Sequence, residues 1–406
     1  MADIQQVSTA IVEDGGTLES PGARKALAGL FVSGILLAYL GAILPAWGHH
    51  ALAEYWVIGL YFVALIAGLL GSVAASAWLL AKKGIGWALS TGCGAAALSF
   101  LYLAFFSPPF SAWWRMPGLL VLGAAAGLLH TAIFHAISPM YQHDPAATVN
   151  LGGALFGLGC MAVAFWISRA FYFYTASAMQ VWLAVIPAFF AIAYARTRFG
   201  PDRVVQRAHV LLDELKSPAA VLFSLVLFFQ FGNEWAIAGW LPLFLSQRLG
   251  LSPSSSIGLL AFYWLALLVG RVLAQWVLPR VRHSRVLVGC VLLSMFACTL
   301  LVLTDNEFGA VLGVLLLGAS FAPIYPLVVE RIGSRFPDYH PGVYNGIFSF
   351  AIGGGLLAPC SLGYFASLID VRVVMFLPLI GSAIVFVLLV CLWLESRLAA
   401  SVKKTA

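Results

Sequence analysis

The sequence predicts an all-α membrane protein with twelve transmembrane helices arranged as two six-helix halves. Three observations indicate this class: the composition, the number of long apolar segments, and one long polar break in the middle of the chain. Of the 406 residues, 62% are hydrophobic and only 9% are charged, whereas a soluble domain carries about 25% charged residues. So few charges cannot cover a surface in water. The composition therefore excludes a cytosolic enzyme and a nucleic-acid-binding protein.

Twelve segments are apolar and long enough to cross the hydrocarbon core of a bilayer, which takes about 20 helical residues. A β-barrel would instead need strands of about 10 residues with alternating polarity, and this alternation is absent. The expected helices cover 27–47, 55–80, 84–106, 115–138, 147–170, 177–196, 219–246, 253–278, 285–304, 308–331, 341–367 and 371–395.

The longest polar break, residues 197–218, divides these segments into an N-terminal half (27–196) and a C-terminal half (219–395). Within the break, apolar residues recur at helical spacing between charged ones, which predicts an amphipathic helix on the cytoplasmic membrane surface. These apolar residues are Val204, Val205, Ala208, Leu211, Leu212 and Leu215. We expect residues 1–26 and 396–406 to form a cytoplasmic N-terminal segment and a cytoplasmic tail.

The basic residues predict the orientation of the chain in the membrane. With both termini cytoplasmic, seventeen of the 22 lysines and arginines fall on the cytoplasmic side, and one, Arg271, falls within a helix. The four expected on the other side are Arg115, Arg169, Arg248 and Arg372. Because Lys and Arg stay in cytoplasmic loops, topology alone accounts for the net charge of +6. The short loops favour a bacterial inner membrane, and we expect a monomer that contacts lipid.

One loop carries a recognisable signature. Gly270 and Arg271, followed by Arg280, Arg282 and Arg285, are similar to the glycine–arginine loop of the major facilitator superfamily. The two six-helix halves and the central linker also resemble this family. The resemblance implies a secondary transporter that works by alternating access and has no cofactor. The phosphate-binding loop G-x-x-x-x-G-K-[ST] is absent, so we do not expect ATP to drive transport.

The seventh segment gives a narrower resemblance. Its run 232–241, Gly-Asn-Glu-Trp-Ala-Ile-Ala-Gly-Trp-Leu, resembles the G-x-E-x-x-x-G-x-aromatic pattern of the fucose:proton symporter family. The run 322–326 (Ala-Pro-Ile-Tyr-Pro) resembles the interrupted tenth helix of that family, and Asn345 with the glycines at 353–355 resembles its eleventh. Members carry simple sugars, so the resemblance implies transport of a monosaccharide or a similar small polar solute.

The first half departs from this family at two positions that matter for proton coupling. Proton-coupled members have a first-helix acid four residues before a proline, where this chain has Gly41 before Pro45. They also have a fourth-helix glutamate, which is replaced here by His130. Either the histidine carries the proton, since it titrates near neutral pH, or the coupling has moved or been lost.

Glu234 is the main candidate for the functional site. A charge in the middle of an apolar spanning helix costs about 3 to more than 10 kcal/mol, so Glu234 is expected to face the interior and to bind substrate or a proton. A structural hydrogen bond to a neighbouring helix is the alternative. Gln230 and Asn233 are expected to extend the same polar face. His130 has two alternative roles: it lines the cavity, or it forms a hydrogen bond to a neighbouring helix.

Further candidates complete the expected site. Trp240 and Tyr263 are expected to stack on a sugar ring, with ordinary packing as the alternative for them and for Trp235 and Trp264. Arg271 and Glu330 lie at inner helix ends, where they form a cytoplasmic gate pair or reach to water. The remaining substrate-binding candidates are Tyr325, Asn345, Ser349 and Asn150.

Two competing functions stay open. The aromatic-rich interior and the missing acids fit an exporter of drugs or amphipathic compounds in the same superfamily. A transport-dead sensor is the other, although the short terminal segments leave little room for a signalling output. We do not expect an enzyme, because no paired carboxylates, Ser/His/Asp set or metal cluster share a region.

Overall fold

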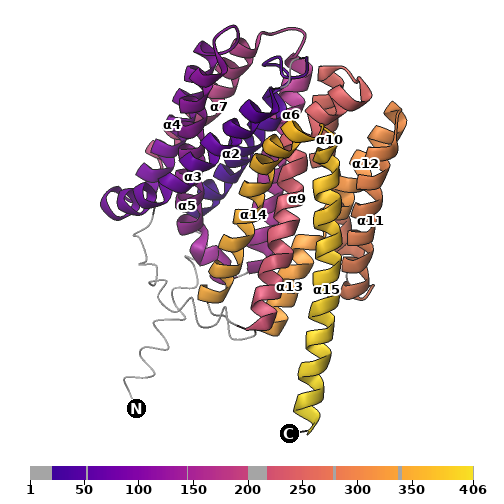
Figure 1. Ribbon diagram of the computed structural model, residues 1–406. Coiled ribbons are helices and arrows are strands. Elements are labelled where there is room, and N and C mark those ends of the chain that lie inside the picture. The colour runs from indigo at the N-terminus through magenta and orange to yellow at the C-terminus, as the bar shows by residue number, and fades with distance from the viewer. Residues whose placement is uncertain are drawn as a thin grey trace, which may run out of the picture.

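The computed structural model describes residues 21–51, 54–143, 145–199, 217–277, 280–336 and 341–405. In this part of the chain it is a helical bundle (Figure 1), and twelve of its helical segments are long and apolar enough to cross a membrane. The predicted fold class is therefore confirmed. The amphipathic helix expected within 197–218 falls almost entirely outside the described residues.

The first half contains six long helices and one short 3₁₀ turn, η1 (Ala112–Trp114). The helices are α2 (Pro21–Ile43), α3 (Tyr55–Lys83), α4 (Ile85–Phe105), α5 (Arg115–His143), α6 (Pro145–Ala170) and α7 (Ala176–Ala195). Within this half, α2 packs against α5 and α6, α3 against α5, and α4 against α5 and α7.

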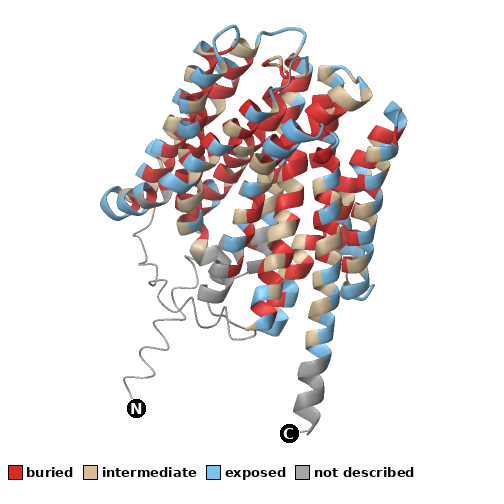
Figure 2. Cartoon of the chain, viewed as in Figure 1, coloured by how far each residue is buried: buried red, intermediate tan, exposed pale blue. Residues whose placement is uncertain are grey.

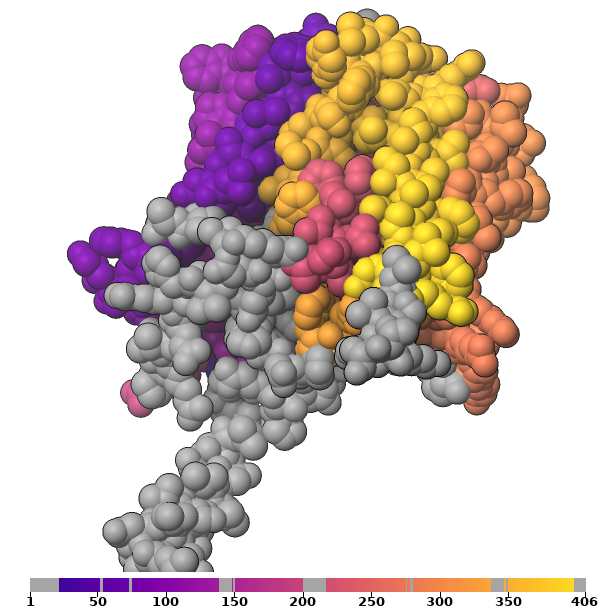
Figure 3. Space-filling model, turned by 60° about the horizontal axis from the view of Figure 1, so that its bottom comes forward, coloured from indigo at the N-terminus to yellow at the C-terminus, as the bar shows by residue number. Residues whose placement is uncertain are grey.

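Among the described residues the second half contains seven helices, because the tenth span is broken in two. They are α9 (Pro218–Leu249), α10 (Pro253–Val277), α11 (His283–Leu303), α12 (Glu307–Phe321), α13 (Ile324–Arg335), α14 (Pro341–Leu368) and α15 (Val373–Thr405). Helix α9 packs between α14 and α15, and its first residues are visible between them in Figure 3. Helix α15 continues to Thr405, past the position 395 where the sequence predicted its end.

The direction of the helices defines two ends of the bundle. We call the end where α9 begins and α15 ends the linker end, and the opposite end the far end; α15 ends at the bottom of Figure 1. At the linker end, Ser217 caps α9 by accepting a hydrogen bond from the Ala220 N–H (3.2 Å). At the far end, α9 terminates at Gly250, whose positive φ of 65° suits glycine.

The break in the tenth span follows from its prolines. Helix α12 ends at Phe321, and α13 begins at Ile324 after Pro323. Neither Pro323 nor Pro326 has an N–H to donate to the preceding turn, so the hydrogen-bond ladder cannot continue there. This interruption agrees with the resemblance of 322–326 to a broken tenth helix.

Burial divides each helix into an inner and an outer face. Buried residues line the inside of the bundle in Figure 2, and exposed residues cover its outside. The exposed side chains include large apolar ones, among them Trp87, Phe165 and Phe189 at 54–67% exposure. In water such a surface would be unstable, whereas in a bilayer it faces lipid.

The two halves meet along a seam where α2 contacts α9, α3 contacts α14, and α6 contacts α10. Glycines allow these helices to approach closely. A Cβ built on Gly41 of α2 would lie 2.1 Å from the Ala238 carbonyl oxygen of α9, and one built on Gly363 of α14 would lie 2.4 Å from the Cα of Gly59. Small residues at such contacts are typical of membrane helix packing.

Hydrogen bonds across the seam gather at the far end. Tyr55 donates to Gln247 Oε1 (2.6 Å), and Gln247 Nε2 donates to the carbonyl of His49 (3.1 Å). Ser168 of α6 and Ser254 of α10 each donate to the other's carbonyl at 2.8 Å. The far end of the seam is therefore closed in this structure.

Candidate functional site

Glu234 lies in the middle of α9, near the seam between the halves. Gln230, one turn earlier on the same helix face, donates a hydrogen bond from Nε2 to Glu234 Oε1 (2.9 Å). Gln230 is 1% exposed, whereas the Glu234 side chain is only partly buried. Among the described residues the carboxylate therefore has Gln230 as its hydrogen-bond donor, and it keeps further oxygen lone pairs for other donors.

A chain of aromatic rings crosses the seam beside this carboxylate. Trp235 of α9 lies 6.0 Å from Phe156 of α6 and 6.1 Å from Trp264 of α10, measured between ring centroids. Phe156 in turn lies 6.1 Å from His130 of α5. Gly355 of α14 makes room for Trp235, because a Cβ there would lie 2.6 Å from its ring. The chain thus connects α5 and α6 of one half with α9 and α10 of the other.

Arg271 brings a positive charge to the same region. Its Nη1 donates to the carbonyl of Gly153 across the seam (3.3 Å). The guanidinium also interacts electrostatically with Glu234, although it is not within the 4 Å of an ion pair. The guanidinium lies close over Gly153, since a Cβ on that residue would lie 2.8 Å from Nη1. Arg271, on α10 of the second half, thus contacts the first half at Gly153 and interacts electrostatically with Glu234 of its own half.

Several polar atoms in this region have no hydrogen-bond partner among the described residues. They are Tyr263 Oη, Trp264 Nε1, His130 Nε2 and Arg271 Nε. Buried polar groups are nearly always hydrogen-bonded, and leaving one unpaired costs about 1–3 kcal/mol. A concentration of unpaired donors beside a carboxylate is what a polar ligand would satisfy.

Tyr325 joins this region through the break in the tenth span. As the second residue of α13, it lies 5.5 Å from Phe231 of α9, ring centroid to centroid, and interacts electrostatically with Arg271 and Glu234. We use the name central cluster for the set that these contacts define. Its members are His130, Phe156, Gln230, Glu234, Trp235, Tyr263, Trp264, Arg271 and Tyr325.

The structure places two of the predicted site residues away from this cluster. Asn233 lies against Ser382 of α15, with 3.3 Å between its Nδ2 and the serine Oγ. Trp240 is fully buried near the far end, where its Nε1 donates to the Pro359 carbonyl (2.9 Å) and its ring stacks on Phe62. Asn233 thus joins a neighbouring helix instead of extending the polar face of Glu234, and Trp240 is packed between helices, as its ordinary-packing alternative expects.

The loop-signature and gate candidates, Gly270, Arg271 and Glu330, do not lie together in the structure. Gly270 packs against the end of α12: a Cβ on it would lie 3.2 Å from the Cα of Ala319 and 2.7 Å from the Cβ of Ala322, the residue after the helix. Arg271 belongs to the central cluster, whereas Glu330 forms an exposed pair with His283 (2.7 Å). In this conformation Arg271 and Glu330 therefore do not pair.

The last predicted residues lie near the linker end. Asn150 is exposed. It precedes Gly153 by about one helical turn, so both residues lie on the side of α6 that faces α10. The side chains of Asn345 and Ser349 on α14 lie outside the part of the chain that the structure describes, so their role stays a prediction.

Sequence reasoning missed Phe156 and the importance of Gly41. Phe156 is one of 29 phenylalanines, and only the neighbouring Gly153 and Gly157, four residues apart, mark its helix as closely packed. Gly41 stands where the resemblance places a family acid, yet a Cβ added at this position would have no room against α9 in this state. The loss of the acid therefore goes together with tight packing of α2 on α9.

Nothing in the described residues indicates a resident metal. No group of three His, Cys, Asp or Glu side chains there is arranged to hold one. The six cysteines, all within the described part, are unpaired thiols.

Comparisons with known proteins agree with this architecture. The Major Facilitator Superfamily model matches residues 146–359 and 223–406. An uncharacterised MFS-type transporter of Yersinia pestis is 23% identical over 146 residues, which are 36% of this chain and 38% of that protein. The matched part is thus well under half of either protein.

Solved structures share the fold at low sequence identity. A nucleoside transporter, NupG, aligns with a TM-score of 0.70 and 12% identity, over 91% of this chain and 99% of that one. A D-xylose–proton symporter aligns at 0.71 and 16%, over 91% and 96%. The E. coli fucose:proton symporter aligns at 0.59 and 15%, over 91% and 98%. With twelve spans and a family model that matches more than half of its length, this chain belongs to the major facilitator superfamily and is a multi-pass membrane transporter, not an enzyme.

Proposed function

We propose that the protein carries a monosaccharide or a similar small polar solute across the membrane by alternating access, and that the solute binds at the central cluster. One observation carries this proposal. Glu234 and its partner Gln230 lie near polar atoms that have no hydrogen-bond partner among the described residues. These atoms belong to Tyr263, Trp264 and Arg271. The solved proteins of the same fold include a xylose symporter, a fucose symporter and a nucleoside transporter, which supports a solute rich in hydroxyl groups.

A sugar suits both chemical features of the cluster. Its hydroxyls can donate to Glu234 and accept from the indole and guanidinium N–H groups, so that each unpaired polar atom gains a partner. Its ring also has an apolar face that can lie on an indole. Trp235 is only partly buried and offers such a face at the seam, where the buried Trp264 lies at 63° to it.

Movement of the halves would give the solute access to each side in turn. The contacts that close the far end, Tyr55–Gln247–His49 and Ser168–Ser254, lie between the halves. In the alternative state these contacts separate, and the central cluster opens toward the far end. The predicted cytoplasmic position of the linker end makes the described state one that is closed to the outside.

Proton coupling is a separate proposal, and Glu234 is the better of the two candidates. A carboxylate can exchange its proton for a substrate hydrogen bond, and both Gln230 and Arg271 are placed to compensate its negative charge. His130 has a buried Nε2 without a partner among the described residues and two aromatic neighbours, Phe134 and Phe156. A positive charge there would lack compensation, so His130 fits better as a neutral ligand of the solute.

One observation favours a competing function. Phe156, Trp235 and Trp264 make the cluster strongly aromatic, and such a lining also suits an amphipathic compound that is exported. The presence of Glu234, Gln230 and Arg271 within the same cluster favours the more polar solute.

Transport assays separate these proposals. Purified protein in proteoliposomes is tested with a panel of labelled monosaccharides and nucleosides, with and without an inward proton gradient. We expect saturable uptake of at least one of these solutes, inhibited by the same unlabelled compound. Uptake of none of them, together with protection of cells against hydrophobic toxins, would contradict the proposal and favour export.

A further inference from the structure

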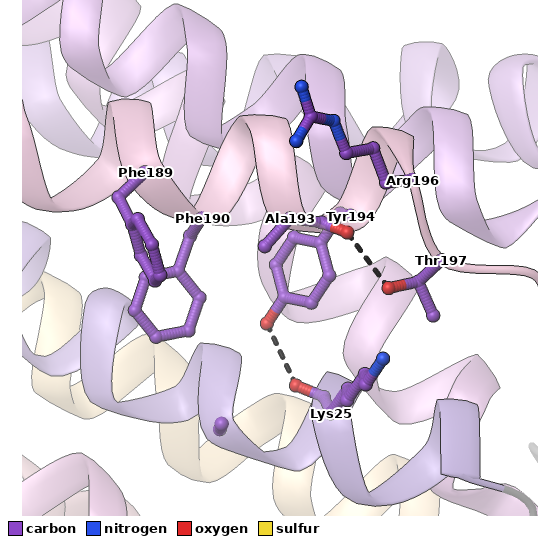
Figure 4. Close-up of a pocket in the computed structure, with 8 residues that line it drawn as sticks. Lys25, Phe189, Phe190, Ala193, Tyr194, Arg196 and Thr197 are labelled. Atoms are coloured by element: carbon purple, nitrogen blue, oxygen red, sulfur yellow. Dashed lines mark hydrogen bonds between the residues drawn. The ribbon is translucent and has the colours of Figure 1, made fainter.

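An open groove lies between the start of α2 and the end of α7, at the linker end of the first half. Its volume is about 340 Å³, and Figure 4 shows the residues that line it. Lys25 and Ala28 come from α2, and the others come from α7 and the two residues after it. The lining residues are Lys25, Ala28, Phe189, Phe190, Ala193, Tyr194, Arg196 and Thr197.

The two helices are held together at the base of this groove. Tyr194 is buried and donates its hydroxyl to the carbonyl of Lys25 on α2 (3.0 Å). Gly29 of α2 gives the tyrosine room, since a Cβ there would lie 2.7 Å from the hydroxyl oxygen. The groove thus has a defined floor between two tethered helices.

The groove has a charged end and an apolar end. Figure 4 shows the Lys25 ammonium and the Arg196 guanidinium toward one end, and the rings of Phe189 and Phe190 toward the other. Arg196 follows Phe190 by six residues, which is about 9 Å along a helix axis. The cations thus lie toward the membrane surface at the linker end, and the rings lie deeper in the apolar span.

The charges of the groove are not neutralised by the described part of the chain. Neither Lys25 nor Arg196 has a carboxylate within 4 Å there. The Thr197 hydroxyl donates back to the Ala193 carbonyl (2.8 Å), so it is engaged within its own turn. Two cations without an acidic partner at the mouth of an apolar groove are complementary to an anion that carries a hydrocarbon chain.

We propose that this groove binds one anionic glycerophospholipid, with its phosphate between Lys25 and Arg196 and an acyl chain along Phe189 and Phe190. Basic residues at the membrane surface attract anionic headgroups, and the apolar rings continue the contact into the bilayer. All lining residues lie on α2, on α7 or in the two residues after α7, and none belongs to the central cluster. The lipid site is therefore independent of the proposed solute.

Native mass spectrometry of the purified full-length chain tests this proposal by counting bound lipid. The probes are dioleoyl phosphatidylglycerol and dioleoyl phosphatidylcholine, which have the same chains and differ in headgroup charge. The test variant is Lys25→Gln with Arg196→Gln. The matched control is Lys82→Gln with Lys83→Gln, which removes the same charge at the same end of the bundle, where the two ammonium groups lie over Trp78 and Trp87.

We expect the wild type and the control to retain one phosphatidylglycerol in preference to phosphatidylcholine. The test variant should bind phosphatidylglycerol about 30-fold more weakly, in line with the loss of two surface cations. Equal retention by the test variant and the wild type, an equal loss in both double variants, or equal binding of the two lipids would overturn the proposal.

A second variant locates the site without altering charge. Ala193→Phe fills the groove and keeps both cations, so we expect it to lose the bound lipid as well, and it carries the test if the double variant does not purify as a single species. Retained lipid in Ala193→Phe would overturn the proposal.

A competition experiment tests the role of the acyl chain. Added inorganic phosphate should not displace the lipid, because phosphate has no acyl chain. Displacement by phosphate would overturn the proposal and indicate a simple anion site instead.

Discussion

The side-chain amide of Gln230 donates a hydrogen bond of 2.9 Å to the carboxylate of Glu234, one turn further along α9. This bond fixes one carboxylate oxygen in the middle of a spanning helix and leaves the remaining lone pairs for a ligand. Arg271 adds a positive charge from α10. Arg271 in turn donates to the carbonyl of Gly153 in the first half, so the acidic side chain of α9 is coupled to the seam through Arg271.

Replacing Gln230 by Leu should weaken solute binding, because Glu234 then loses its protein donor. A hydrogen bond to a charged group contributes about 1.5–3 kcal/mol, so we expect the apparent KM for uptake to rise about 10-fold or more. Gln230→Asn keeps an amide donor and should recover part of the loss. An unchanged KM in Gln230→Leu would show that this bond has no role in binding.

The response to a proton gradient should depend on Glu234 and not on His130. In proteoliposomes, Glu234→Gln cannot release or take up a proton, so we expect gradient-driven accumulation to disappear. His130→Gln keeps a neutral polar side chain and should retain the accumulation at a reduced rate. If both variants accumulate solute as the wild type does, neither residue carries the proton.

Two tryptophans on the same helix should behave differently on truncation. Trp235 belongs to the central cluster, so Trp235→Ala should reduce uptake at least tenfold with little change in Tm, and Trp235→Phe should restore part of it. Trp240 is fully buried and bonded to Pro359, so Trp240→Ala should lower stability by about 3–5 kcal/mol. Thermal unfolding in detergent measures the second effect. If Trp240→Ala instead reduces uptake without a loss of stability and Trp235→Ala does not reduce it, the solute binds nearer the far end than the central cluster.

The closure of the far end can be tested with a disulfide. Ser168 and Ser254 bond to each other's carbonyls at 2.8 Å, so cysteines at both positions should be close enough to cross-link. We expect oxidation of Ser168→Cys/Ser254→Cys to stop uptake and reduction to restore it. Full transport by the oxidised protein would mean that these helices need not separate.

Tight packing at Gly41 should be required for this closed state. Gly41→Ala puts a Cβ 2.1 Å from the Ala238 carbonyl, and overpacking costs about 1–3 kcal/mol. In the background of the cysteine pair, we expect cross-linking to become at least fivefold slower. Gly94→Ala is the matched control, because nothing lies within 4 Å of a Cβ at that position; an equal effect in both variants would contradict the role of Gly41.

The fold could be predicted because its signals are local. Apolar segments of about 20 residues identify spanning helices in any sequence, and Pro323 with Pro326 marks the break between α12 and α13. The apolar segments do not fix where a helix ends in water. Helix α15 continues to Thr405 as a helix because nothing in the sequence after 395 breaks it.

The site could be predicted only in part, because it depends on which way each side chain turns. Successive helical residues differ by about 100° in direction, so Asn233 faces α15 although it adjoins Glu234. Phe156 carries no polar group and is recognised only through its contacts with His130 and Trp235. The membership of Arg271 in the cluster depends on the packing of α6 against α10, which no local sequence signal specifies.

The most direct test of the central claim compares solute binding by the wild type, Glu234→Gln and Glu307→Gln. Glu307 is an exposed residue in the first turn of α12 at the far end, so its substitution provides a matched control. Equilibrium binding of the transported labelled solute to purified protein is the measurement. We predict at least tenfold weaker binding for Glu234→Gln and unchanged binding for Glu307→Gln. Wild-type affinity in Glu234→Gln would contradict the assignment of the central cluster as the solute site.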